Sequence, residues 1–74
     1  MDVRIGMSNS SREISFETEL SAAEVMSSIE KAAKDEQRFV VFEDVRDNQW
    51  HVNVQAIIFV EFGSATGRRV GFVN

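Results

Sequence analysis

Residues 20–25, Leu-Ser-Ala-Ala-Glu-Val, decide the fold because they fix the start of the one helix that the sequence predicts. Ser21 and Glu24 have the spacing of a capping box. In that motif the serine hydroxyl accepts a hydrogen bond from the Glu24 amide, and the Glu24 carboxylate accepts one from the Ser21 amide. Leu20 and Val25 are spaced as the hydrophobic staple that accompanies such a start. We therefore expect a helix that begins just after Ser21.

Apolar residues recur along this segment with the period of a helix, and the pattern runs to about Glu36. Glu30, Lys31 and Lys34 lie largely off this stripe. The alanines within it allow close approach to a neighbouring element. We expect the stripe to pack on a sheet; its members are Ala22, Val25, Met26, Ile29, Ala32 and Ala33.

Runs with the alternation of β-strands lie on both sides of the helix. Before it, residues 3–7 and 14–17 are separated by the turn cluster Ser8–Ser11, which is typical of a hairpin. After it come four runs, which are residues 39–42, 50–52, 57–62 and 68–73. Two turns are predicted between them, one at Arg46–Asn48, where Asn48 is able to take a left-handed conformation at modest cost, and one at Asn53–Ala56.

The order of these elements predicts a single α+β domain over residues 1–74. Its order is β-β-α-β-β-β-β, a mostly antiparallel sheet with one helix packed on one face. Phe39–Phe42 is apolar on both faces, so we place it centrally in the sheet.

Composition limits the class of protein. The chain has 74 residues, no cysteine and a formal net charge of −4. An acidic chain has no overall attraction for nucleic acid, so we predict no DNA partner. The start of the chain lacks the apolar run of a signal peptide, and no apolar stretch approaches the roughly 20 residues that cross a bilayer. We expect a cytoplasmic protein with no membrane partner.

The glycine-rich stretch Gly63–Gly67, followed by two arginines, is a candidate phosphate site. Amides of such a turn can surround an anion, and guanidinium groups can clamp phosphate oxygens. A strand follows here, however, whereas a P-loop opens a helix. A hairpin loop with solvated arginines is the competing interpretation. The candidate contacts are Gly63, Ser64, Thr66, Gly67, Arg68 and Arg69, with Arg46 and Trp50 as helpers.

Other polar residues have ordinary interpretations. Trp50 could stack a base, but a single tryptophan in so short a chain fits the core or its rim. Glu43, Asp44 and Asp47 lack the spacing of a calcium loop and fit a solvated turn. Glu61 is expected to pair with Arg68 or Arg69 across the last hairpin.

No catalytic or metal-binding motif is visible in the sequence. His51 is the only histidine, and nothing near it resembles a nucleophile elbow. We therefore predict no enzyme, no cofactor, no metal and no catalytic residue.

Five segments together resemble a small actinobacterial family of unknown function. They are Met1–Gly6, Arg12–Ile14, Ser21–Val25, Ile57–Gly63 and Arg68–Phe72. Asn48 to Asn53 depart from the Gly-Arg turn and Val-x-Val-Pro segment that such proteins often have. The resemblance implies a cytoplasmic protein, and some members carry a nucleotide-binding (ATP) label.

Two functions follow from these patterns. The leading hypothesis is an interaction module that binds a protein partner, or itself, through a sheet edge or the uncovered sheet face. Val70 and Phe72 in the last strand are the candidate interaction edge. The alternative is a nucleotide- or RNA-binding domain that uses the Gly63–Gly67 loop with Arg68 and Arg69. An Sm-like ring suits the strand-rich second half, but the two strands before the helix do not fit that topology.

Overall fold

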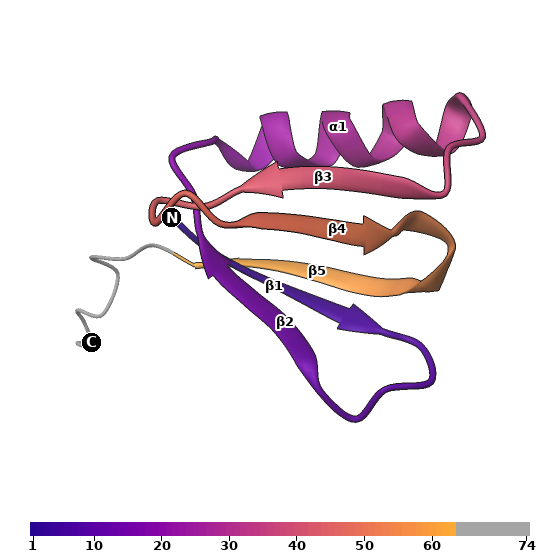
Figure 1. Cartoon of the computed structure of the whole chain (residues 1–74), viewed down its shortest axis with the longest axis horizontal. Helices are drawn as coiled ribbons and strands as arrows, with labels where there is room; N and C mark the ends of the chain where they lie inside the picture. Colours follow the sequence, from indigo (N-terminus) through magenta and orange to yellow (C-terminus); the bar gives the residue numbers. More distant parts are fainter. Residues whose placement is uncertain (64–74) are drawn as a thin grey trace, which may run out of the picture.

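The computed structural model of the chain describes residues 1–63, with one helix and five strands (Figure 1). Their order confirms the α+β class and the order β-β-α-β-β-β over these residues. The sixth predicted strand, residues 68–73, lies outside the described part. The elements are β1 (Asp2–Met7), β2 (Glu13–Glu17), α1 (Ala22–Lys34), β3 (Phe39–Glu43), β4 (Gln49–Asn53), the 3-10 turn η1 (Val54–Ala56) and β5 (Ile57–Gly63).

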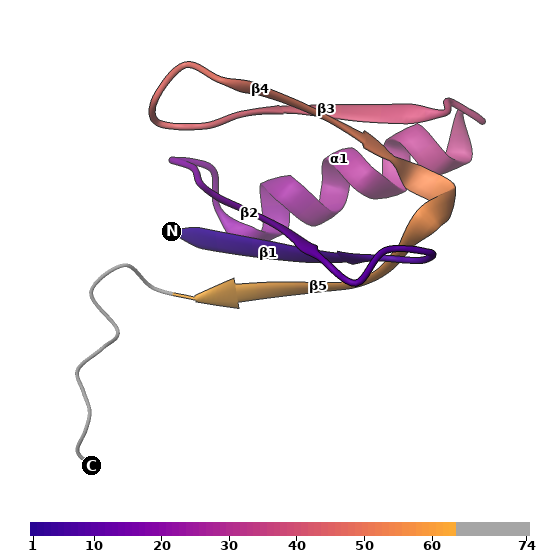
Figure 2. The same ribbon diagram turned by 60° about the horizontal axis from the view of Figure 1, so that its bottom comes forward.

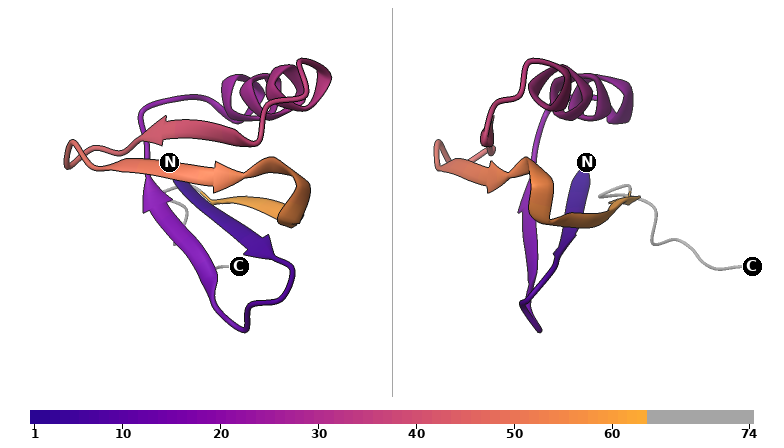
Figure 3. Two further views of the ribbon diagram at one scale, coloured as in Figure 1. Left: turned by 45° about the vertical axis from the view of Figure 1, so that its right-hand side comes forward. Right: turned by 90° about the vertical axis from the view of Figure 1, so that its right-hand side faces the viewer.

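The strands form two antiparallel sheets, β2-β1-β5 and β3-β4. The predicted antiparallel pairing is confirmed. The strands fall into two sheets rather than one because η1 turns the chain between β4 and β5. Figures 2 and 3 show the helix, the β3-β4 hairpin and the three-stranded sheet as three sides of one interior. No helix in residues 1–63 is long and apolar enough to cross a membrane.

The core draws equally on these three sides. Three buried apolar residues come from the three-stranded sheet, three from α1 and three from the hairpin. The helical residues are Val25, Ile29 and Ala32, which lie on the predicted stripe. Side chains of the size of Val25 and Ile29 contribute about 1.5–3 kcal/mol each when fully buried. The other six are Val3, Ile5, Phe16, Val40, Phe42 and Val52.

Both ends of α1 are closed by local hydrogen bonds. The predicted capping box is present, with 2.9 Å from the Ser21 amide to Glu24 Oε1 and 3.1 Å from the Glu24 amide to Ser21 Oγ. At the other end the helix finishes at Lys34, two residues before the predicted end. There Glu36 has a φ of 60°, and the amide of Gln37 donates to the Ala32 carbonyl over 2.9 Å. This is a Schellman closure with glutamate where glycine is usual.

The predicted central position of Phe39–Phe42 is wrong for the described residues. Within residues 1–63, β3 pairs only with β4, and α1 lies along its other side (Figure 1). Val40 and Phe42 face the core, whereas Phe39 and Val41 are 46% and 50% exposed. The strand is apolar on both faces although only one face is buried by this part of the chain.

The left-handed residue of the Glu36 turn gives a direct test. Glu36→Gly should raise the free energy of unfolding by about 0.5–1 kcal/mol, because glycine adopts a positive φ without the Cβ penalty. Asp35→Gly is the matched control. Asp35 has a φ of −82°, so glycine there should only destabilise. The measurement is the urea midpoint of each variant, and a lower midpoint for Glu36→Gly would contradict the assignment.

Candidate functional site

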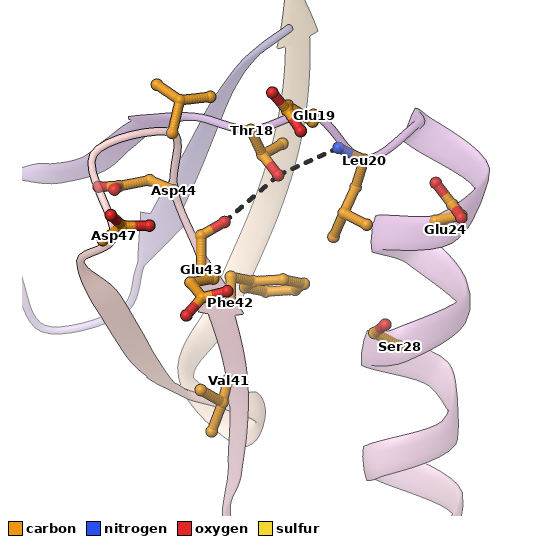
Figure 4. A pocket seen from close by; sticks show the side chains of 11 residues that line it. Thr18, Glu19, Leu20, Glu24, Ser28, Val41, Phe42, Glu43, Asp44 and Asp47 are labelled. Carbon is orange, nitrogen blue, oxygen red and sulfur yellow. Dashed lines mark hydrogen bonds between the residues drawn. The ribbon is translucent and has the colours of Figure 1, made fainter.

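A groove lies between the first half of α1 and strand β3, with a volume of about 560 Å³ (Figure 4). Its lining comes from the β2–α1 connection, the helix, β3 and the β3–β4 turn. The residues are Thr18, Glu19, Leu20, Glu24, Ser28, Val41, Phe42, Glu43, Asp44, Val45 and Asp47. Segments separated by more than twenty residues in sequence therefore form one concave surface.

The lining combines apolar side chains with negative charge. Leu20 and Phe42 are the more buried apolar members, and Val41 and Val45 are 50% and 46% exposed. Five of the eleven lining residues are acidic, and none is lysine, arginine or histidine. The groove therefore offers carboxylates around an apolar surface.

Thr18 holds the two walls of the groove together. Its side chain is buried, with 2% exposure. Its hydroxyl accepts a hydrogen bond from the Leu20 amide over 3.2 Å and donates to the Glu43 carbonyl over 3.4 Å (Figure 4). The Val45 amide also donates to the Glu17 carbonyl over 2.9 Å. These bonds connect the end of β2 to the end of β3, so the groove is a fixed part of the fold.

Asp44 organises the β3–β4 turn. Its Oδ1 accepts hydrogen bonds from the amides of Arg46 (2.8 Å) and Asn48 (2.9 Å). Its Oδ2 accepts from Asn48 Nδ2 (3.2 Å) and from Trp50 Nε1 (2.9 Å). The hydrogen bond from Trp50, aided by the two amides and the Asn48 side chain, lowers the pKa of Asp44 to about 2, although desolvation opposes this shift.

The same hydrogen bonds explain which residue of the turn is left-handed. The sequence indicated Asn48 as a residue able to take that conformation, but Asp47 takes it, with a φ of 64°. The Asp44 carboxylate binds both the amide and the side chain of Asn48, which fixes Asn48 just before β4. Among residues 1–63 there is no group of three or more side chains suited to a metal ion.

The structure brings two of the candidate ligand residues together. Arg46 and Trp50 line a second hollow of about 330 Å³, beside β2, which also contains the carboxylates of Asp2, Glu17 and Asp44. The Trp50 ring stacks on Phe16 with 5.5 Å between centroids and 21° between planes. This places Trp50 at the rim of the core, as the packing interpretation predicted.

The remaining candidates divide at Gly63, the last residue of β5, which pairs with Asp2. Ser64, Thr66, Gly67, Arg68, Arg69, Val70 and Phe72 lie outside the described residues. Glu61 pairs with Arg4 on β1, with 2.9 Å between Arg4 Nε and Glu61 Oε1. The sequence had indicated Arg68 or Arg69 as its partner. His51 is exposed, and its Nε2 lies 3.3 Å from Gln49 Oε1.

Sequence reasoning missed the groove. No motif marks it because its lining comes from four separate segments. Two signals were present, however. Residues 13–36 contain seven acids against two lysines, and Phe39–Phe42 has more apolar side chains than one buried face requires.

The chain was compared with known proteins. The model of a family described as protein of unknown function (DUF3107) matches residues 1–73. No curated protein matches the chain. The predicted resemblance to a small family of unknown function is therefore confirmed.

The lowered pKa of Asp44 predicts a specific pH dependence. Because its folded-state pKa of about 2 lies below the ordinary value of 3.8, the unfolded chain binds the proton more tightly. The stabilisation is complete above the ordinary pKa and is lost as the pH falls towards 2.

Urea midpoints measured from pH 5 to pH 2 should therefore fall for the wild-type chain and fall less for Asp44→Asn. Trp50→Phe, which removes the largest contributor to the shift, should also flatten the curve. Equal slopes for Asp44→Asn and wild type would show that Asp44 is not responsible.

Proposed function

We propose that the chain, which belongs to the family of proteins of unknown function DUF3107, is a protein-interaction module whose α1–β3 groove binds a basic and partly apolar segment of a partner. The observation that supports this function best is the composition of the groove, five acidic residues and no basic one around exposed Val41 and Val45.

Charge selects the kind of partner. Like charges gathered in a concave surface reinforce one another's potential, which attracts a cation and speeds its association. Asp44 is already engaged by the turn, and Glu24 by the capping box. Glu19, Glu43 and Asp47 are exposed at the rim. These three carboxylates are the ones we expect to meet arginine or lysine side chains.

Apolar surface supplies the second part of the recognition. Val41 lies on the outer side of β3 together with Phe39, so an apolar row leads from the strand into the groove. An extended segment presents alternate side chains to opposite sides. A strand that alternates basic and apolar residues would place one set against the carboxylates and the other against this row.

The uncovered face of the three-stranded sheet is less suited to a protein partner than the α1–β3 groove. On its outer side Arg4 hydrogen-bonds Glu61 and lies 3.4 Å from Glu13, so its polar groups already serve one another. Of the two protein-binding surfaces expected from the sequence, this face is therefore the weaker choice.

Nucleotide or RNA binding remains the alternative. It depends on Arg68 and Arg69, outside the described residues, together with Arg46 and Trp50. The hollow that contains Arg46 and Trp50 also holds three carboxylates, which would repel a phosphate. Binding is proposed rather than catalysis, since the side chain of His51 contacts an amide and not a nucleophile.

Titrations followed by ¹⁵N–¹H NMR test the proposed function. A decapeptide that alternates arginine and valine should shift the amides of the groove, and a matched glutamate-valine decapeptide should not. ATP and a short single-stranded RNA serve as probes for the alternative. Shifts confined to residues 63–69, Arg46 and Trp50 with those two probes would replace the proposal with the alternative.

Two variants and a control test whether the arginine-valine peptide binds in the α1–β3 groove. Glu43→Gln should weaken the arginine-valine peptide about two- to fivefold at low salt, the range of one exposed charge pair. Val41→Thr should also weaken it, because the substitution keeps the β-branched shape and removes apolar area. Glu30→Gln is the matched control, since Glu30 is exposed on α1 but does not line the groove. Equal losses for Glu43→Gln and Glu30→Gln would contradict the groove as the site.

A further inference from the structure

We propose that the second edge of β5 is a docking site for the chain's own segment Arg68–Val73, in a register that places Arg69 opposite Glu61 and Gly71 opposite Phe59. This inference concerns a surface other than the α1–β3 groove and does not depend on the proposed function. It assigns an occupant to an edge that the described residues leave open.

β5 is an outer strand of its sheet. It pairs along one edge with β1, and within residues 1–63 no strand pairs with the other edge. The strand is seven residues long, and its Ile58 and Phe59 are 66% and 41% exposed. A long apolar edge with unpaired amides and carbonyls is a template for another strand.

The outer side of β5 carries two features that suit particular neighbours. Glu61 lies opposite Arg4, and the contacts between them use only Glu61 Oε1. Oε2 has no partner among residues 1–63, so the carboxylate can accept from a second cation. Phe59 lies opposite Gly6, and its ring covers the position that a Cβ at Gly6 would occupy. The ring therefore rests on a glycine of one neighbouring strand.

The inner side of β5 is apolar and incompletely covered. Val60 and Phe62 pair with Ile5 and Val3, which are fully buried. Val60 and Phe62 themselves are only half-buried at the open edge. Apolar side chains from a further strand would complete this part of the core.

The sequence after Gly63 has the pattern of side chains that the open edge of β5 requires. A five-residue connection at residues 63–67, with a glycine at each end, is a common length for a hairpin. It brings Arg68 opposite Phe62 and places the next residues in order along β5. Arg69 then meets Glu61, and Gly71 meets the Phe59 ring. On the inner side, Val70 and Phe72 extend the apolar row.

A shift of one residue would reverse every side chain. Arg69 would then point to the inner side beside Phe62, the position that Arg68 takes in the first register. Val70 and Phe72 would point outward. One guanidinium lies beside Phe62 in either register, so the first register is selected by the Arg69–Glu61 pair and by the apolar side chains of Val70 and Phe72 on the inner side.

The short connection favours the chain's own segment over that of a second copy. A short flexible link gives an effective concentration on the order of millimolar. The same segment on another molecule competes only at comparable protein concentration. We therefore assign the occupant in cis.

Nuclear Overhauser effects in the full-length chain test this assignment. At about 0.1 mM protein, where the millimolar effective concentration favours the cis arrangement, cross-strand effects should join Glu61 to Arg69 and Phe59 to Gly71. A mixed sample of labelled and unlabelled chains separates the two sources of strand. Effects seen only between different chains would overturn the cis assignment, and effects in another register, or none, would overturn the docking itself.

Two adjacent arginines supply a matched pair of variants. Arg69→Glu puts like charges opposite each other, so amide protection in residues 68–73 should fall. Arg68→Glu makes the same change of charge on the other side of the strand. It should reduce the amide protection less than Arg69→Glu does. Exchange of amide hydrogens measures both. Equal protection in the two variants would contradict the pairing of Arg69 with Glu61.

Discussion

The stacking of Phe16 between the two sheets is the interaction on which the rest of the structure depends. Phe16 belongs to β2, and its ring stacks on Phe42 of β3 and on Trp50 of β4, with centroid distances of 5.7 Å and 5.5 Å. No ladder of paired residues joins the two sheets within residues 1–63. Aromatic pairs contribute about 0.5–1.5 kcal/mol each beyond the area that they bury. This contact therefore sets how the hairpin lies on the three-stranded sheet.

The groove follows from that contact. Because Phe16 holds β3 and β4 beside the end of β2, Thr18 can reach the Glu43 carbonyl and Glu17 can bind the Val45 amide. The chain then has only four residues before α1 begins at Ala22, so the helix starts close to the end of β3. Carboxylates from both segments consequently face one space. The acidity of the groove is a property of the fold and is not visible in any one segment.

The sequence predicts well what is decided locally. The capping box needs only Ser21 and Glu24, and it is present with both hydrogen bonds. The helical stripe and the first hairpin also depend on neighbouring residues, although the left-handed residue of the β3–β4 turn is Asp47 and not the Asn48 that the sequence indicated. The predicted central position of β3 was wrong because an apolar strand can be covered by another strand, by a helix or by a partner. The sequence pattern of the strand is the same in each case. The contact of Glu61 with Arg4 was not predicted for a similar reason. Arg4 lies 57 positions away, and only strand order brings the two together.

The exposed apolar residues connect the two surfaces that we propose. Within residues 1–63, nine buried apolar side chains form the core, and they come from all three sides of the fold. Apart from Met1, the large apolar side chains that remain exposed in residues 1–63 fall into two groups, Phe39, Val41 and Val45 on and after β3, and Ile58 and Phe59 on β5. Scattered exposed residues need no explanation, but grouping along one strand does.

Each group lies on, or directly after, a strand that pairs along one edge only within the described residues. The β5 group continues into a segment of the same chain whose pattern fits it, whereas the β3 group adjoins carboxylates that no basic residue in the groove lining accompanies. We therefore propose the chain itself as the occupant of the first surface and another molecule as the occupant of the second.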